Sequence, residues 1–428
     1  MRTSSLRPAL LAILPICLVA ATATPVIAAG HGPARPPAWT ATWAAAPHAP
    51  VPGNDFDGPN WSVPGFTDTT IRQVVRSSAG GSQVRIRLSN AYGVRPVRLA
   101  GASIARSGPG ASVRPGTART VRFGRDTEAT VPAGGSLASD PVDLRVSPLE
   151  SLTVTLYFAE FTGPATFHQD GLTTTYRAAG DHRDDAGAAA FAGETSRSRY
   201  FLTGVDVAGE PGARGVVVAF GDSITDGHGT RADADNRYPD QLAERSATGK
   251  RPVAVVNAGI GGNKLLADSP CYGDRATARF GRDALDQPGV GAVVVLEGVN
   301  DIGAGGYPDF GCGASPTART ADLVRAHRTL IRAAHQRGIR IIGATVTPMK
   351  NFTGYYDPDK ERVRDELNRW IRTGGEYDAV VDLDRLLADP HDPDALRAEF
   401  DFGDGLHLND AGADAIAAAV FRVLARAA

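Results

Sequence analysis

The chain has 428 residues, of which 42% are hydrophobic and 21% are charged, as is usual for globular proteins. This length is large for a single hydrophobic core, so we expect two domains. The formal net charge of −2 gives no indication of a nucleic-acid partner, and we expect none.

Residues 1–28 have the pattern of a secretory signal peptide. Two arginines precede an apolar run at 9–23, and small residues suited to cleavage follow near Ala28. A membrane anchor is the alternative, but Pro15 interrupts the run, which is shorter than the roughly 20 apolar residues that a span requires. We therefore expect a secreted protein without stable membrane insertion.

Residues 38–205 alternate apolar and polar side chains with a period of two. The stretches "QVRIRLSN" (83–90) and "SLTVTLYF" (151–158) are the clearest examples, and turn clusters such as "SSAGGS" separate such runs. No helical stripe intervenes. The pattern predicts an antiparallel β-sandwich or jelly-roll domain.

A glycine-rich segment, residues 206–215, is predicted to be a linker. Behind it, at 216–428, apolar strands alternate with helical segments, which predicts a parallel sheet covered on both faces. The strands are "VVVAF", "VAVVNAG", "AVVVLEG", "IRIIGATV" and "YDAVVDL", and the helices lie at 238–247, 278–287, 320–338, 359–375 and 411–426. Ligands of such folds bind beyond the carboxyl ends of the strands.

Those strand ends carry glycine and polar residues. The first strand ends in Gly221-Asp222-Ser223, the second runs into 257–262, and the third runs into 298–301. A serine hydroxyl at the start of a helix is a weak nucleophile and needs a base. Without a base, Ser223 would be a plain helix cap.

His407 is the candidate base. The stretch "DGLHLNDAG" places it before the last helix and three residues after Asp404. An aspartate at that spacing can orient one ring nitrogen and leave the other to accept the serine proton. A helix-entry turn is the alternative. His327, on the stripe of the long helix, is more typical of a packed structural histidine.

Four blocks, "FGDSITDG", "NAGIGGNKLL", "VLEGVNDIG" and "DGLHLND", occur in this order on the α/β pattern. Together they resemble the SGNH or GDSL hydrolase family, over about residues 215–428. The resemblance implies a flavodoxin-like five-stranded fold and a serine esterase, lipase or deacetylase that needs no cofactor. It implies Ser223 as nucleophile, His407 as base and Asp404 as its orienting group. The implied oxyanion donors are the backbone N–H groups of Ser223 and Gly262, with Gly261 as the competing glycine, and the side chain of Asn300.

Asp222 and Asp301 adjoin proposed catalytic residues, and we interpret both as backbone caps rather than acid–base groups. No cluster of His, Cys and carboxylate residues has the spacing of metal ligands, so we predict no metal site.

After removal of the signal peptide only Cys271 and Cys312 remain, and a disulfide is expected outside the cell, with two free thiols as the alternative. The bridge would join loops 263–277 and 302–319, which follow the second and third strands. Tyr272, Tyr307 and Phe310 in these loops are candidates for a sugar subsite or an acyl groove, or for simple loop packing.

The sequence thus predicts a secreted serine esterase acting on carboxylic esters of short acyl or O-acetyl groups, with carbohydrate as one candidate alcohol. A lipase or phospholipase acting on longer chains is an alternative. The other is a noncatalytic carbohydrate-binding protein that uses Trp39, Trp43 and Trp61 as stacking platforms. The expected partner is a small-molecule, carbohydrate or lipid ester, and the oligomeric state is not predicted.

Overall fold

The computed structural model describes residue 1 and residues 38–53, 58–209, 215–249, 251–306, 312, 313 and 315–426. Apart from Met1, the predicted signal peptide at 1–28 lies outside the described residues. Among the residues that are described, no helix is long and apolar enough to cross a membrane. Residues 37–428 form one compact unit.

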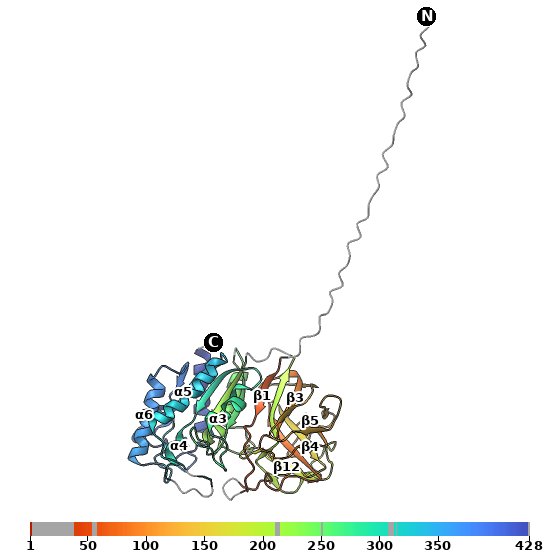
Figure 1. Cartoon of the computed structure of the whole chain (residues 1–428), viewed down its shortest axis with the longest axis horizontal. Helices are drawn as coiled ribbons and strands as arrows, with labels where there is room; N and C mark the ends of the chain where they lie inside the picture. The colour runs from red at the N-terminus through yellow and green to blue at the C-terminus, as the bar shows by residue number, and fades with distance from the viewer. Residues whose placement is uncertain are drawn as a thin grey trace. The chain divides into compact units, whose positions relative to one another are not determined.

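Two antiparallel sheets share a hydrophobic core in the first half of this unit (Figure 1). One has the order β1 (Thr40–Ala44), β15 (Leu202–Ala208), β3 (Gly81–Ser89), β8 (Ser136–Ala138), and β9 (Val142–Val146) also pairs with β3. The other has the order β13 (Thr195–Ser196), β12 (Thr175–Ala179), β2 (Thr69–Arg76), β10 (Ser151–Phe158), β5 (Gly101–Arg106), β6 (Arg119–Val121). Two short pairs, β11 (Phe167–His168) with β14 (Arg199–Tyr200) and β4 (Val97–Leu99) with β7 (Ala129–Val131), and a 3-10 turn at Ala189–Phe191 complete this half.

The predicted alternation holds in β3, where Val84, Ile86 and Leu88 are buried. In β10 the threonines that alternate with leucine and valine are buried as well, because β10 lies between β2 and β5 and its second face is also covered. In a central strand that is covered on both faces, polar side chains are buried too, so the alternation does not identify a solvent-exposed face.

The tryptophans predicted as stacking platforms are not exposed, so that prediction is wrong. Trp43 and Trp61 are 7% and 2% exposed and belong to the core. Trp39 is half-buried, and the Arg85 guanidinium lies 4.4 Å above its ring centroid. Large aromatic side chains in a sandwich contribute more to stability when buried between the sheets than when left in solvent.

The second half contains a five-stranded, all-parallel sheet, as the α/β pattern predicts. Its order is β17 (Ala254–Gly259), β16 (Val216–Gly221), β18 (Val290–Leu296), β19 (Arg340–Ala344), β20 (Ala379–Val381). This 2-1-3-4-5 order is the flavodoxin-like arrangement that the resemblance implied, and its topological switch point lies between β16 and β18.

Helices cover both faces of this sheet. The pair α2 (Tyr238–Ala247) and α8 (Asp410–Arg426) pack on each other, as do α5 (Thr320–Gln336) and α6 (Pro358–Thr373). The predicted helix at 278–287 is instead α3 (Ala276–Phe280) followed by a π-helical turn, Gly281–Leu285. Three short helices, α1 (Ser223–Asp226), α4 (Val299–Gly303) and α7 (Leu383–Leu387), follow the carboxyl ends of β16, β18 and β20.

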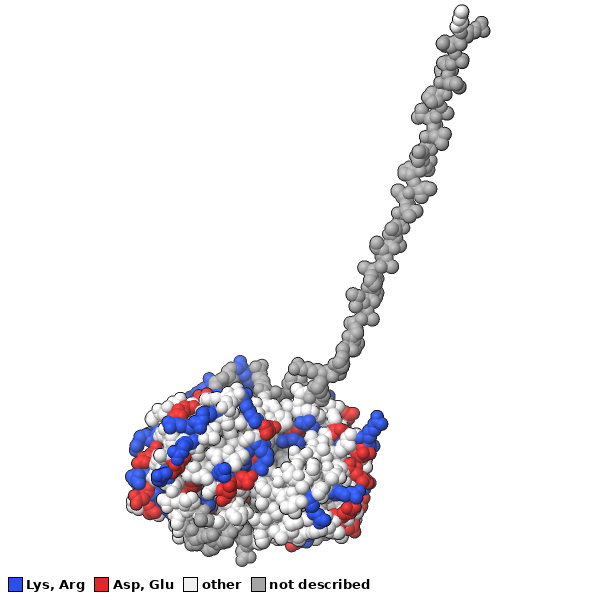
Figure 2. Space-filling model, viewed as in Figure 1, with Lys and Arg blue, Asp and Glu red and all other residues white. Residues whose placement is uncertain are grey.

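The two halves contact each other through backbone and side-chain hydrogen bonds. The Ala41 N–H donates to Pro288 O at 2.8 Å, and the Val255 N–H donates to Ser78 Oγ at 3.0 Å. The segment predicted as a linker begins inside β15, which continues to Ala208, and residues 210–214 lie outside the described residues. Acidic and basic side chains are intermixed on the face seen in Figure 2.

Candidate active site

The proposed nucleophile lies where β16 gives way to α1, beside the switch point of the sheet. Asp222 caps α1, because its Oδ1 accepts the Ile224 N–H at 2.9 Å, and Ser223 is the first helical residue. Its side chain is therefore placed at the carboxyl edge of the sheet, where ligands of this architecture bind.

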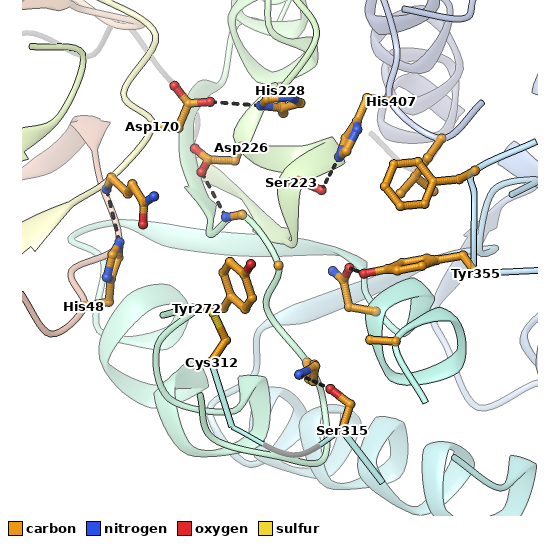
Figure 3. A pocket seen from close by; sticks show the side chains of 18 of the residues that line it. His48, Asp170, Ser223, Asp226, His228, Tyr272, Cys312, Ser315, Tyr355 and His407 are labelled. Atoms are coloured by element: carbon orange, nitrogen blue, oxygen red, sulfur yellow. Dashed lines mark hydrogen bonds and ion pairs between the residues drawn. The ribbon is translucent and has the colours of Figure 1, made fainter. Parts of the chain in front are cut away.

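Ser223, His407 and Asp404 form a continuous hydrogen-bonded chain. His407 Nε2 lies 2.9 Å from Ser223 Oγ (Figure 3). His407 Nδ1 lies 2.6 Å from Asp404 Oδ2. The other oxygen of Asp404 accepts the backbone N–H groups of Leu406 and His407, at 2.9 and 2.8 Å. These contacts fix the carboxylate, which then fixes the ring with Nδ1 protonated and Nε2 facing the serine.

The pKa shifts of Asp404 and His407 suit a general base at His407. Burial alone would raise the pKa of Asp404, but the hydrogen bonds from His407 and the backbone outweigh burial and lower that pKa. Burial lowers the pKa of His407 below its ordinary 6.5, and the bond to Asp404 offsets this only in part. His407 is thus neutral at neutral pH and can accept a proton.

The hydrogen bonds also distinguish between Gly261 and Gly262, the two candidate glycines of the oxyanion site. The Gly261 N–H donates to Asp226 Oδ2 at 3.1 Å, so it is already used. Within the part of the chain that the structure describes, the Gly262 N–H has no acceptor. This favours Gly262 over Gly261 as the donor to a developing oxyanion.

Asn300, in α4, is held by two hydrogen bonds. Its Nδ2 donates to Asn263 O at 3.0 Å, and its Oδ1 accepts from Tyr355 Oη at 3.1 Å. A side-chain amide nitrogen carries two hydrogens, so the second is available to a ligand in the pocket. The Asn263 carbonyl oxygen can only accept, so this contact identifies the amide atom beside it as the nitrogen.

A buried acidic cluster, Asp222, Glu297 and Asp301, lies behind the nucleophile around one cation, Arg279. Burial raises the pKa of Asp222 and of Glu297, and it raises the pKa of Asp301 to about 6. As predicted, Asp222 and Asp301 cap backbone N–H groups, in Asp301 those of Leu265 and Leu266.

A pocket of about 210 Å³ opens onto Ser223, His407, Gly262 and Asn300. Cys271 and Cys312 are joined by a disulfide between the loops that follow β17 and β18. Tyr272, beside this bridge, lines the pocket. Tyr307 and Phe310, the other aromatic residues predicted there, lie outside the described residues.

Residues 219–415 match the family model described as "GDSL-like Lipase/Acylhydrolase family". These residues carry a GDSL-like lipase/acylhydrolase domain. A match to this family implies a small-molecule ester as the substrate. A comparison with curated proteins finds no match.

Solved structures similar to the GDSL-like domain include a lipase/acylhydrolase from Enterococcus faecalis, with 22% identity over 49% of this chain and 94% of that chain, TM-score 0.38. An acetyl xylan esterase has 20% identity over 49% of this chain and 99% of that chain, TM-score 0.37. A GDSL-like lipase from Bacteroides thetaiotaomicron VPI-5482 has 18% identity over 50% of this chain and 90% of that chain, TM-score 0.39.

The β half, which lies outside the matched residues, also contributes to the pocket of the GDSL-like domain. His48, Gln169 and Asp170 line it, as do Phe352 and Tyr355. In Figure 3, His48 and Asp170 lie on the opposite side of the pocket from Tyr355. No sequence pattern indicates a role for His48, Gln169 or Asp170. Their positions depend on the packing of one half against the other, for which the sequence carries no local signal.

A second Asp–His pair adjoins the proposed base. Asp170 Oδ2 lies 3.2 Å from His228 Nδ1, and the rings of His228 and His407 meet edge to face with centroids 4.5 Å apart. Burial alone would raise the pKa of Asp170, but the hydrogen bond with His228 outweighs it and lowers that pKa. The pocket therefore has a charged, hydrogen-bonding wall supplied partly by the β half.

Among the described residues, no group of three or more His, Cys, Asp or Glu side chains is placed to hold a metal ion. His327, interpreted from the sequence as a packed histidine, is fully buried in α5, and its Nδ1 lies 2.6 Å from Tyr377 Oη.

Proposed function

We propose that this protein is a secreted serine esterase that hydrolyses carboxylic esters through an acyl-enzyme on Ser223. The observation that carries the proposal is the Asp404–His407–Ser223 chain, with contacts of 2.6 and 2.9 Å, at a pocket that also presents Gly262 and Asn300. Nucleophile, base and orienting group are within hydrogen-bonding distance, as nucleophilic catalysis requires.

In acylation, Ser223 Oγ attacks the ester carbonyl carbon while its proton passes to His407 Nε2. The carbonyl oxygen becomes an oxyanion, which the N–H groups of Ser223 and Gly262 and the amide of Asn300 stabilise. When the intermediate collapses, the C–O bond to the alcohol breaks and His407 returns the proton to the leaving oxygen. Water then attacks the acyl-enzyme, His407 accepts its proton, and the acid leaves as Ser223 regains a proton.

The pocket favours a short acyl group. Its volume of about 210 Å³ is below the roughly 300–1,000 Å³ of typical small-molecule sites. A polar wall that includes Gln169, Asp170 and His228 supports a polar, hydroxyl-rich alcohol such as a sugar. A long-chain lipase is the weaker candidate, because an extended acyl chain requires an apolar groove.

Secretion remains part of the proposal. It is supported by the signal-like pattern of residues 1–28 and by the disulfide between Cys271 and Cys312, since disulfides persist in oxidising compartments. The noncatalytic carbohydrate-binding alternative loses its stacking residues, since Trp43 and Trp61 are buried.

The test is the hydrolysis of nitrophenyl esters from acetyl to palmitoyl by the protein and by its Ser223→Ala variant. We expect activity that is highest with acetyl and is lost in the variant, together with covalent labelling of Ser223 by an organophosphonate. A maximum with palmitoyl would support the lipase. Undiminished hydrolysis by Ser223→Ala would contradict the serine mechanism.

A further inference from the structure

His168, in β11 of the β half, uses both nitrogens of its ring. Nδ1 lies 3.0 Å from Ala46 O, and Nε2 lies 3.1 Å from Asp226 Oδ1. The Ala46 carbonyl oxygen can only accept, so Nδ1 carries a proton, and the Asp226 carboxylate beside Nε2 favours a second proton there and hence the charged ring. Burial alone would lower the pKa of His168, but the charge and hydrogen bond of Asp226 outweigh burial and raise it.

Asp226 is the last residue of α1, three positions after the proposed nucleophile, and it connects His168 to the oxyanion loop. Its Oδ2 accepts the Gly261 N–H at 3.1 Å (Figure 3). Here α1 approaches β17 so closely that a Cβ on Gly259 would lie 2.2 Å from the Asp226 nitrogen. The carboxylate is thus held between a cation from the β half and a backbone N–H of the loop.

That N–H belongs to a pair of glycines whose conformation matters for the chemistry. Gly261 and Gly262 are consecutive glycines, and Gly262 has a φ of +69°. Such a pair has wide conformational freedom unless its surroundings restrict it. The Gly261 N–H lies in the Ile260–Gly261 peptide unit, so its bond to Asp226 anchors the loop one Cα before the peptide unit that carries the Gly262 N–H, the proposed oxyanion donor.

The positive charge of His168 is needed because Asp226 lies beside the oxyanion loop. A buried carboxylate beside the oxyanion loop repels the negative charge that develops on the substrate, and this repulsion is strong where solvent is excluded. Arg237 is also nearby, but its guanidinium makes hydrogen bonds of 2.7 and 3.2 Å to Asp240. His168 is the cation in direct contact with Asp226, and both side chains are buried.

We propose that His168 and Asp226 are positioning residues for ester hydrolysis: Asp226 orients the Gly261–Gly262 loop, and His168 neutralises Asp226 and holds it in place. The β half is then a part of the catalytic machinery rather than a separable binding module. This inference rests on the function proposed above.

The experiment measures kcat and KM for nitrophenyl acetate in the full chain carrying His168→Gln, Asp226→Asn, or both. Outer-shell partners of this kind typically contribute about 10- to 100-fold. We expect His168→Gln to lower kcat by about that factor with little change in KM, because it leaves the Asp226 charge uncompensated. Asp226→Asn removes that charge and keeps an acceptor for Gly261, so the double variant should recover part of the kcat lost in His168→Gln.

A matched control is His327→Gln, which also breaks the hydrogen bond of a buried histidine, at a position that does not line the pocket. It should lower the melting temperature and leave kcat unchanged. Wild-type kcat in His168→Gln, a double variant slower than His168→Gln, or an equal kcat loss in His327→Gln would each overturn the inference. If His168→Gln does not fold, Asp226→Ala, which removes the acceptor of the Gly261 N–H, decides: wild-type kcat overturns the inference, and reduced kcat with unchanged KM supports it. Activity that survives Ser223→Ala would instead refute the proposed function.

Discussion

The aromatic ring of Tyr272 lies directly against the Cα of Gly262. A Cβ built on Gly262 would be only 2.5 Å from two atoms of the ring, and the φ of +69° at this residue is one that side-chain-bearing residues rarely adopt. Position 262 therefore requires glycine for two reasons, close approach and backbone conformation. Both bear on the residue whose N–H we assign to the oxyanion site.

Gly262→Ala should reduce kcat for nitrophenyl acetate by on the order of 100-fold or more, the loss typical of one missing oxyanion donor. The added methyl group must displace either Tyr272 or the loop. Gly261→Ala is the matched comparison, since no atom lies within 4 Å of a Cβ built there, and its loss should be much smaller. Equal losses in the two variants would contradict the assignment of Gly262.

Asn300→Ala should lower kcat by about 100- to 1000-fold and leave the fold intact, because it removes a donor that strengthens its bond only as the oxyanion forms. Tyr355→Phe removes the hydrogen bond that orients the amide and keeps the ring, so it should cause a smaller loss. Steady-state kinetics with circular dichroism checks both. An unchanged kcat in Asn300→Ala would show that the Asn300 side chain does not stabilise the oxyanion.

The pH dependence of kcat/KM should follow the protonation of His407. Its pKa lies below 6.5 because burial disfavours the charged ring, so the active neutral form predominates at pH 7, and the rate falls as the pH decreases through that pKa. Asp404→Asn removes the carboxylate that raises the pKa of His407, so this pKa should fall. The acid limb of the residual activity should therefore move to lower pH. A midpoint above 6.5 in the wild type would contradict this electrostatic account.

The GDSL-like part of the site could be predicted because its chemistry lies in local patterns. Ser223 follows a buried strand, and Asp404 and His407 are three residues apart in a turn before a helix. The order of the strands was implied only by the resemblance to the SGNH or GDSL family, because the rules for parallel strands with crossover helices allow more than one order. Short apolar strands and long amphipathic helices were predicted nearly at their observed limits, whereas the π-helical turn after α3 has no sequence signal of its own.

The contributions of the β half could not be predicted. His48, His168 and Asp170 reach the active site only because two separately patterned halves pack together, and contacts distant in sequence leave no periodic signature. The burial of Trp43 and Trp61 could not be predicted either, because an isolated aromatic residue in a strand-rich segment is compatible with a core or with a binding surface.

The disulfide couples stability to the oxyanion site. Cys271→Ala opens a link between residues 41 positions apart, which in the chain-entropy model destabilises the fold by about 4 kcal/mol. Because Tyr272 follows Cys271 and packs on Gly262, the variant should also have a lower kcat at temperatures far below its melting point. Thermal unfolding and nitrophenyl acetate kinetics with and without a thiol reductant measure both effects. Reductant should reproduce them in the wild type and add nothing in Cys271→Ala. Unchanged melting temperature and kcat in the variant would show that the bridge neither stabilises the fold nor holds Tyr272 against the loop.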